Sequence, residues 1–156
     1  MKTVLITGGT VNTGLAIARH FAKNGYAVAI TGRNAERAAQ VATGIAAEFH
    51  APVKGYALEL SDVNRIREVV EEVERDFSSL DVLVANAANL GIGCGVLNTN
   101  EPDFSSIADV NIKGTFFSCQ AAAEVMKRHG GGISRHGCRC RSRRRNGGHK
   151  STCRGG

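Results

Sequence analysis

The sequence contains no long hydrophobic run, and no apolar stretch approaches the roughly 20 residues that a membrane span needs. We therefore expect no interaction with a membrane. A length of 156 residues leaves no room for a second substantial domain. The five cysteines are an odd number, which does not fit a disulfide framework. The apolar run after Met1 is too short for a signal peptide, so we expect a cytoplasmic protein.

Acidic residues are missing from the last 24 positions. Residues 133–156 carry seven Arg and one Lys, whereas residues 1–132 carry 12 basic and 14 acidic residues. The net charge of +6 therefore arises from the tail alone. Ile133 is the only large aliphatic residue of this tail, so little in it can cover a sheet. We predict one domain over residues 1–132 and a basic tail without fixed structure over residues 133–156.

Short apolar runs alternate with helical patterns before the tail, which is typical of βαβ units and a parallel sheet. The fold class predicted is α/β: a doubly wound parallel sheet with strand order 3-2-1-4, truncated after about four strands. We expect Asn34, and either Ser61 or Asp62, to cap the second and third helices. A helical break is predicted near Gly114. The strands are expected at residues 4–6, 27–30, 53–60 and 82–85, and the helices at about 13–23, 35–49, 63–77 and 102–129.

The sequence TGGTVNTG occupies residues 7–14, between the first predicted strand and the first helix. Glycines there let the backbone approach a pyrophosphate closely, and free amides at a helix N-terminus stabilise negative charge. Such a turn alone is weak evidence, because a purely structural strand-to-helix turn has the same features. The motif therefore indicates a phosphate site only if other parts of the chain agree.

Three further features do agree. Asp62 follows the third strand, NAA closes the fourth at residues 86–88, and DVNIKGTF lies on the next helix at residues 109–116. In this order and spacing the motifs resemble the short-chain dehydrogenase/reductases, a family of Rossmann-fold NAD(P) enzymes. The resemblance covers residues 3 to about 132. It implies an oxidoreductase that transfers a hydride reversibly between NAD(P)(H) and a small-molecule carbonyl or alcohol, in a homodimer or homotetramer.

The resemblance also implies a set of cofactor-binding residues. Its turn motif, Thr-Gly-x-x-x-Gly-x-Gly, has Asn12 here in place of the middle glycine and Thr13 in place of the usual isoleucine. Asn tolerates a positive φ better than other non-glycine residues do, so we expect the turn to survive. By this resemblance, Gly8, Thr10 and Gly14 lie under the cofactor's phosphates, and Asp62 hydrogen-bonds its adenine. Asn86 stabilises the central strands, and Ala87 and Ala88 lie beside the cofactor.

One catalytic residue is implied by the resemblance. Asn111 matches the active-site asparagine whose helix kink holds a water in the proton relay. The family also uses a Tyr-x-x-x-Lys pair and an upstream serine. The sequence has only Tyr26 and Tyr56, and neither is followed by Lys four residues later. We therefore predict that the chain as written is catalytically incomplete.

The choice between NADP and NAD can be argued from the residues after the second strand. NAD-selective dinucleotide folds usually carry an acid there to bind the ribose 2′-hydroxyl. This chain reads TGRN at residues 31–34, without an acid, and Arg33 could pair with a 2′-phosphate. A solvated surface arginine is the alternative. We predict NADP as the cofactor.

The tail admits several interpretations. Its abrupt change of composition is what a shifted reading frame produces in GC-rich coding DNA, and in that case the sheet would end at residues 82–85. Zinc ligation would need a Cys-x-x-Cys spacing that the tail lacks, so no metal site is expected. The arginines of residues 139–145 could contact phosphates, but no base-reading scaffold accompanies them, so no specific nucleic acid is expected. The alternative functions are a non-catalytic dinucleotide-binding remnant and a basic-tailed nucleic-acid binder.

Overall fold

A computed structural model of the chain describes residues 1–91, 93, 95–130, 132–134 and 139–140. Strands and helices alternate along these residues, as the sequence pattern predicts. The elements are β1 (Thr3–Ile6), α1 (Asn12–Lys23), β2 (Ala27–Gly32), α2 (Ala35–Phe49), β3 (Val53–Ala57), α3 (Val63–Phe77), β4 (Val82–Val84), α4 (Glu101–Ala108), the π-helical turn η1 (Asp109–Gly114), α5 (Thr115–Arg128), β5 (Gly132–Ser134) and β6 (Arg139–Cys140).

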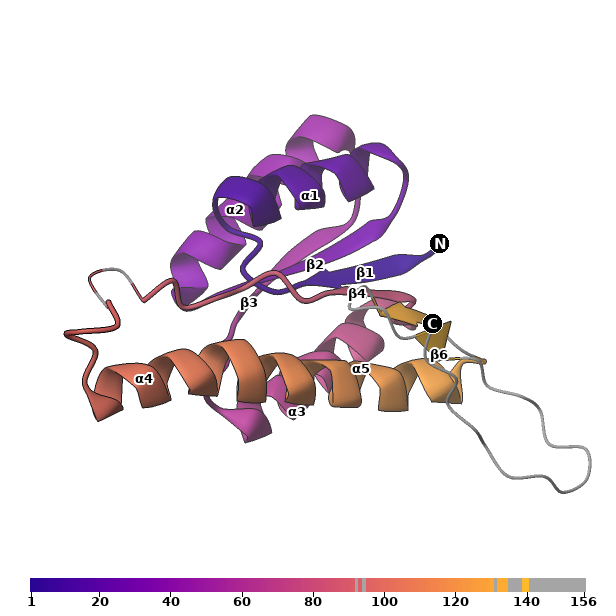
Figure 1. The fold of residues 1–156 in the computed structure, drawn as a ribbon. Helices are drawn as coiled ribbons and strands as arrows, with labels where there is room; N and C mark the ends of the chain where they lie inside the picture. Colours follow the sequence, from indigo (N-terminus) through magenta and orange to yellow (C-terminus); the bar gives the residue numbers. More distant parts are fainter. Residues whose placement is uncertain (92, 94, 131, 135–138, 141–156) are drawn as a thin grey trace, which may run out of the picture.

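The strands form one sheet in the order β3-β2-β1-β4-β5-β6. The first five are parallel and β6 is antiparallel to β5. Helices α1 and α2 cover one face of the sheet, while α3 and α5 cover the other (Figure 1). The predicted fold class, a Rossmann-like doubly wound sheet with strand order 3-2-1-4, is confirmed. No helix in the described ranges is long and apolar enough to cross a membrane.

The sheet continues beyond β4, whereas a shifted reading frame in the tail was expected to end it at residues 82–85. Ile133 pairs with Val82 and Ser134 with Leu83, so β5 extends the sheet beyond residue 132. Residues 139–140 then pair with β5, although their composition predicts no fixed structure. A ladder uses only backbone N–H and C=O groups, so it can form where large apolar side chains are few. The rest of the tail lies outside the described residues.

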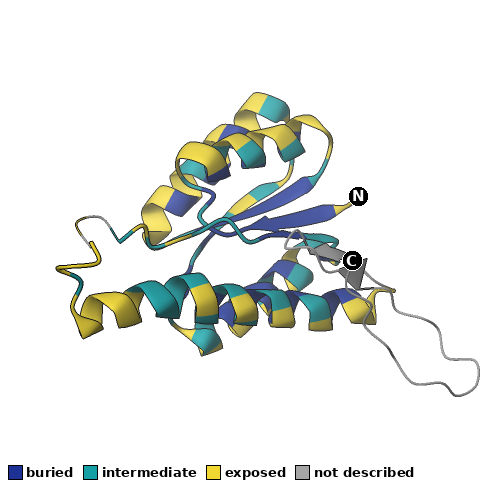
Figure 2. Ribbon diagram, in the orientation of Figure 1, coloured by how far each residue is buried: buried dark blue, intermediate teal, exposed yellow. Residues whose placement is uncertain are grey.

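The central strands have buried side chains on both faces, which explains their continuous apolar runs (Figure 2). Because successive side chains point to opposite faces, Val4 and Ile6 pack with α1 and α2, whereas Leu5 packs with α3 and α5. β3 ends at Ala57, earlier than the predicted Leu60. Leu60 is nevertheless buried, so its apolar character reflects packing rather than strand pairing.

Two helices begin where the capping residues predict. The Asn34 side chain accepts a hydrogen bond of 2.8 Å from the Arg37 amide at the start of α2. The Asp62 carboxylate accepts bonds of 3.0 Å from the amides of Asn64 and Arg65 at the start of α3. Each cap satisfies amides that have no partner within the helix. The choice between Ser61 and Asp62 is thereby settled for Asp62.

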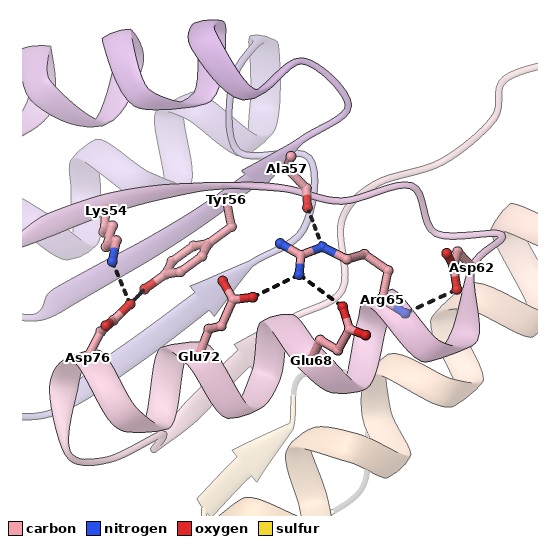
Figure 3. A network of polar contacts seen from close by, with 8 residues as sticks. All are labelled: Lys54, Tyr56, Ala57, Asp62, Arg65, Glu68, Glu72 and Asp76. Carbon is pink, nitrogen blue, oxygen red and sulfur yellow. Dashed lines mark hydrogen bonds and ion pairs between the residues drawn. The ribbon is translucent and has the colours of Figure 1, made fainter.

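A polar network ties the edge strand β3 to α3 (Figure 3). The Tyr56 hydroxyl donates to Asp76 Oδ2 at 2.7 Å, and Lys54 Nζ lies 2.8 Å from the same oxygen. Further along the helix, Arg65 donates to the Ala57 carbonyl and pairs with Glu68 and Glu72. The Arg65 pKa is raised by hydrogen bonds to these two carboxylates. The network holds the helix against a strand that has no neighbour on its outer side among the described residues.

This network predicts how stability depends on pH. Hydrogen bonds from Lys54 and Tyr56 lower the Asp76 pKa below 3.8, so their stabilisation is complete above that pH and is lost on further acidification. Burial, followed by the bond to Asp76, raises the Tyr56 pKa above 10.0, so stability is lost as the pH rises beyond 10. Tyr56→Phe should cost about 1.5 kcal/mol at pH 7 and flatten the alkaline loss. Urea unfolding from pH 3 to 11 measures both effects.

The matched control is Tyr26→Phe, which removes a hydroxyl outside the network. It should leave the alkaline loss of stability in place, because Tyr56 is still present. Equal alkaline slopes for wild type and Tyr56→Phe would contradict the assignment of this loss to Tyr56.

Candidate functional site

The turn that joins β1 to α1 lies at the carboxyl edge of the sheet and requires glycine at two positions. Gly8 has φ +67°, and a methyl group there would come within 2.9 Å of the Ala87 Cβ. At Gly14 a methyl group would collide with the Gly8 carbonyl oxygen and lie 2.7 Å from Asn86 Nδ2. The first turn of α1 is therefore packed directly against the backbone of the preceding loop.

Asn12 occupies the position of the missing motif glycine. Its φ is +46°, in the left-handed region, so the expected tolerance of asparagine for this conformation is confirmed. Asn12 and Thr13 are both exposed. The turn therefore keeps a compact shape while its tip faces solvent.

The N-terminus of α1 offers unpaired backbone donors. The first i→i−4 bond runs from the Leu15 amide to the Val11 carbonyl at 3.1 Å, so the amides of residues 12–14 have no partner within the helix. No acidic residue lies in the first turn, and Val11 has no capping side-chain bond. This helix end has the donors and the dipole that suit an anion such as a phosphate.

Asn86 holds the loop after β4 against this turn. Its side-chain Nδ2 donates to the carbonyl oxygens of Thr7 and Gly8, at 3.1 and 3.3 Å. In return, Thr7 Oγ1 accepts the backbone amides of Asn86 and Ala87 at 3.0 and 3.1 Å. These four bonds join the ends of β1 and β4 and place Ala87 beside Gly8. Ala88, the next residue, is exposed.

Thr7 and Thr31 also belong to the site, although the sequence motifs did not predict them. Thr31, at the end of β2, accepts the Gly8 amide on its hydroxyl at 3.3 Å and the Gly9 amide on its carbonyl at 3.0 Å. Both threonines are only 2% exposed. The sequence signal that could have indicated them is a threonine at the carboxyl end of each of two apolar strands. A polar side chain buried there must find a hydrogen-bond partner.

Arg33 follows β2 directly and is exposed at the same edge. Thr10 of the turn packs on the preceding residue, since a methyl group at Gly32 would lie 2.7 Å from Thr10 Cγ2. The backbone at Arg33 is therefore adjacent to the turn. Asp62, beyond β3, caps α3 through Oδ1, as described above. The roles of Arg33 and Asp62 toward a cofactor remain predictions.

Asn111 lies in η1, where the long helix widens by π-helical turns instead of breaking at Gly114. Its Nδ2 donates to the Asn89 carbonyl at 2.9 Å, and its Oδ1 accepts the Asn89 amide at 2.7 Å. Gly114 faces the chain after β3, because a methyl group there would collide with the Leu60 carbonyl oxygen. Asn111 thus fixes the loop after β4 to the helix, and π-helical turns often mark functional sites.

The structure brings most of the predicted residues together through direct contacts. The turn residues, Asn86 and Ala87 form one bonded cluster, and Thr10 links it to the end of β2. Neither tyrosine belongs to this cluster. Tyr56 faces α3, and Tyr26 packs its ring on Phe21 beside the amino end of β2. The histidines and cysteines of the tail lie outside the described residues, apart from the backbone of Cys140.

A doubly wound parallel sheet with a glycine turn of this kind defines the class of dinucleotide-binding α/β proteins. A family model described as short chain dehydrogenase matches residues 2–134. The chain belongs to this family, as the sequence motifs predicted.

Curated relatives and solved structures agree with this assignment. The chain is 31% identical over 133 residues to a 3α-hydroxysteroid dehydrogenase of Mediterraneibacter gnavus, covering 85% of this chain and 53% of the relative. It is 30% identical over 131 residues to D-threitol dehydrogenase of Mycolicibacterium smegmatis, covering 84% of this chain and 50% of the relative.

Among solved structures, an alcohol dehydrogenase of Thermococcus sibiricus, complexed with 5-hydroxy-NADP, matches with a TM-score of 0.76 and 30% identity. The match covers 86% of this chain and 56% of that one. NAD⁺-bound xylitol dehydrogenase matches with a TM-score of 0.80, 27% identity and coverage of 85% and 51%. The chain spans about half the length of the curated relatives it matches.

Proposed function

We propose that residues 1–132 are the NADP(H)-binding domain of a short-chain oxidoreductase. The observation that carries this proposal is the turn at residues 7–14, in which two glycines let backbone pack on backbone beside the open N-terminus of α1. The solved relatives in complex with 5-hydroxy-NADP and NAD⁺ support a dinucleotide as the ligand. Fluorescence titration of NADPH against the purified chain tests the proposal, and the absence of saturable binding would refute it.

The residues of the turn fit a pyrophosphate. The amides of Asn12, Thr13 and Gly14 would donate to its oxygens, and no side chain at Gly8 or Gly14 blocks the approach. Bound NADP(H) supplies the hydride acceptor or donor for interconversion of a small-molecule carbonyl and alcohol. Asn86, with Thr7 and Thr31, keeps the turn in place, and Ala87 and Ala88 would lie beside the cofactor.

Two further residues have proposed roles, one in binding the cofactor and one in the proton relay. Asp62 would accept a hydrogen bond from the adenine with its carboxylate, whose Oδ1 already accepts two amides. Asn111 would hold a water of the proton relay by means of its η1 backbone, since its side chain is bonded to Asn89. A π-helical turn leaves carbonyl groups displaced from the regular α-helical pattern, which supports this role.

NADP is the proposed cofactor because Arg33 follows β2 where NAD-selective folds carry an acid. Arg33→Ala should weaken NADPH binding about 10-fold, since a charge-assisted pair with the 2′-phosphate is lost. NADH binding should change by less than about 2-fold, because NADH has no 2′-phosphate. Paired fluorescence titrations measure both affinities.

Arg75→Ala removes the same charge at the far end of α3 and is the control for net charge. Equal losses for both nucleotides would contradict the proposed contact.

Self-association is proposed for the outer side of the α4–η1–α5 helix. Phe104, Ile112 and Phe116 are 65%, 70% and 62% exposed there, and clustered apolar exposure on a helix marks an interaction surface. A homodimer or homotetramer would cover these side chains. Location in the cytoplasm remains a prediction from the sequence. The basic tail, which suggested a nucleic-acid binder, lies almost wholly outside the described residues and supports no second function.

A further inference from the structure

We draw no further inference here: the strongest candidate, the open groove beside α1 whose lining includes Ile17, His20 and Tyr26, carries nothing because nothing in the described part of the structure shows what covers it.

Discussion

Alanine in place of Gly14 is expected to cost about 2–4 kcal/mol of stability and to weaken NADPH binding by more than about 10-fold. The added methyl group would collide with the Gly8 carbonyl oxygen and approach Asn86 Nδ2 to 2.7 Å. The first contact is with backbone, so rotation of a side chain cannot relieve it. Either α1 moves away from the turn or the turn opens, and both changes displace the amides that would hold the phosphates.

Gly44→Ala is the matched control for this change. Gly44 lies within α2, and a methyl group there meets no atom within 4 Å. Alanine at this position should stabilise the chain by about 0.5–1 kcal/mol, because glycine is a poor helix former, and should leave NADPH affinity unchanged. Urea unfolding and NADPH titration of both variants check the pair of expectations. A folded Gly14→Ala protein with wild-type affinity for NADPH would show that the turn does not bind the cofactor.

Short-range features of this fold could be read from the sequence. Asn34 and Asp62 cap the helices they precede, because a cap needs only a side chain and an amide two or three residues away. The same holds for Asn12, whose tolerance of positive φ is a property of the residue itself. The parallel order of the first four strands followed from the alternation of apolar strands with helices.

Features that depend on contacts between distant segments were not predictable in the same way. The Thr31 bonds to the turn span more than 20 residues, and those between Thr7 and Asn86 span 79. Nothing in the local pattern around either threonine indicates these partners. The apolar run at residues 53–60 likewise predicted too long a strand, because a buried irregular segment and a strand share the same hydrophobicity.

The candidate site therefore combines local and long-range causes. The glycine turn is encoded locally, but its position at the cofactor edge depends on Asn86 from β4 and Thr31 from β2. Substitution of either residue would leave the motif intact in the sequence while removing what holds it in place. The bonds that surround the turn are therefore stronger evidence for a cofactor site than the sequence motif alone.

The second large effect expected is the absence of dehydrogenase turnover by the 156-residue chain. Proton transfer by a positioned general acid contributes about 10²–10⁴ in rate, and the chain offers no tyrosine for this task at the candidate site. The Tyr56 hydroxyl donates a hydrogen bond to Asp76, and burial raises the Tyr56 pKa above its ordinary value of 10.0. Tyr26 precedes β2, at the amino end of the strands and opposite the cofactor edge. Asn111 cannot replace them, because an amide does not titrate near pH 7.

The assay follows NADPH oxidation with a panel of ketones and ketose sugars. The Gly14→Ala chain, purified in parallel, should lose cofactor binding and therefore reports the activity of any contaminating host reductase. We expect the two samples to be indistinguishable. Steady turnover by the wild-type chain that exceeds the Gly14→Ala background would contradict the prediction. Because hydride transfer to a carbonyl must be completed by a proton, such turnover would require a proton donor other than Tyr26 and Tyr56.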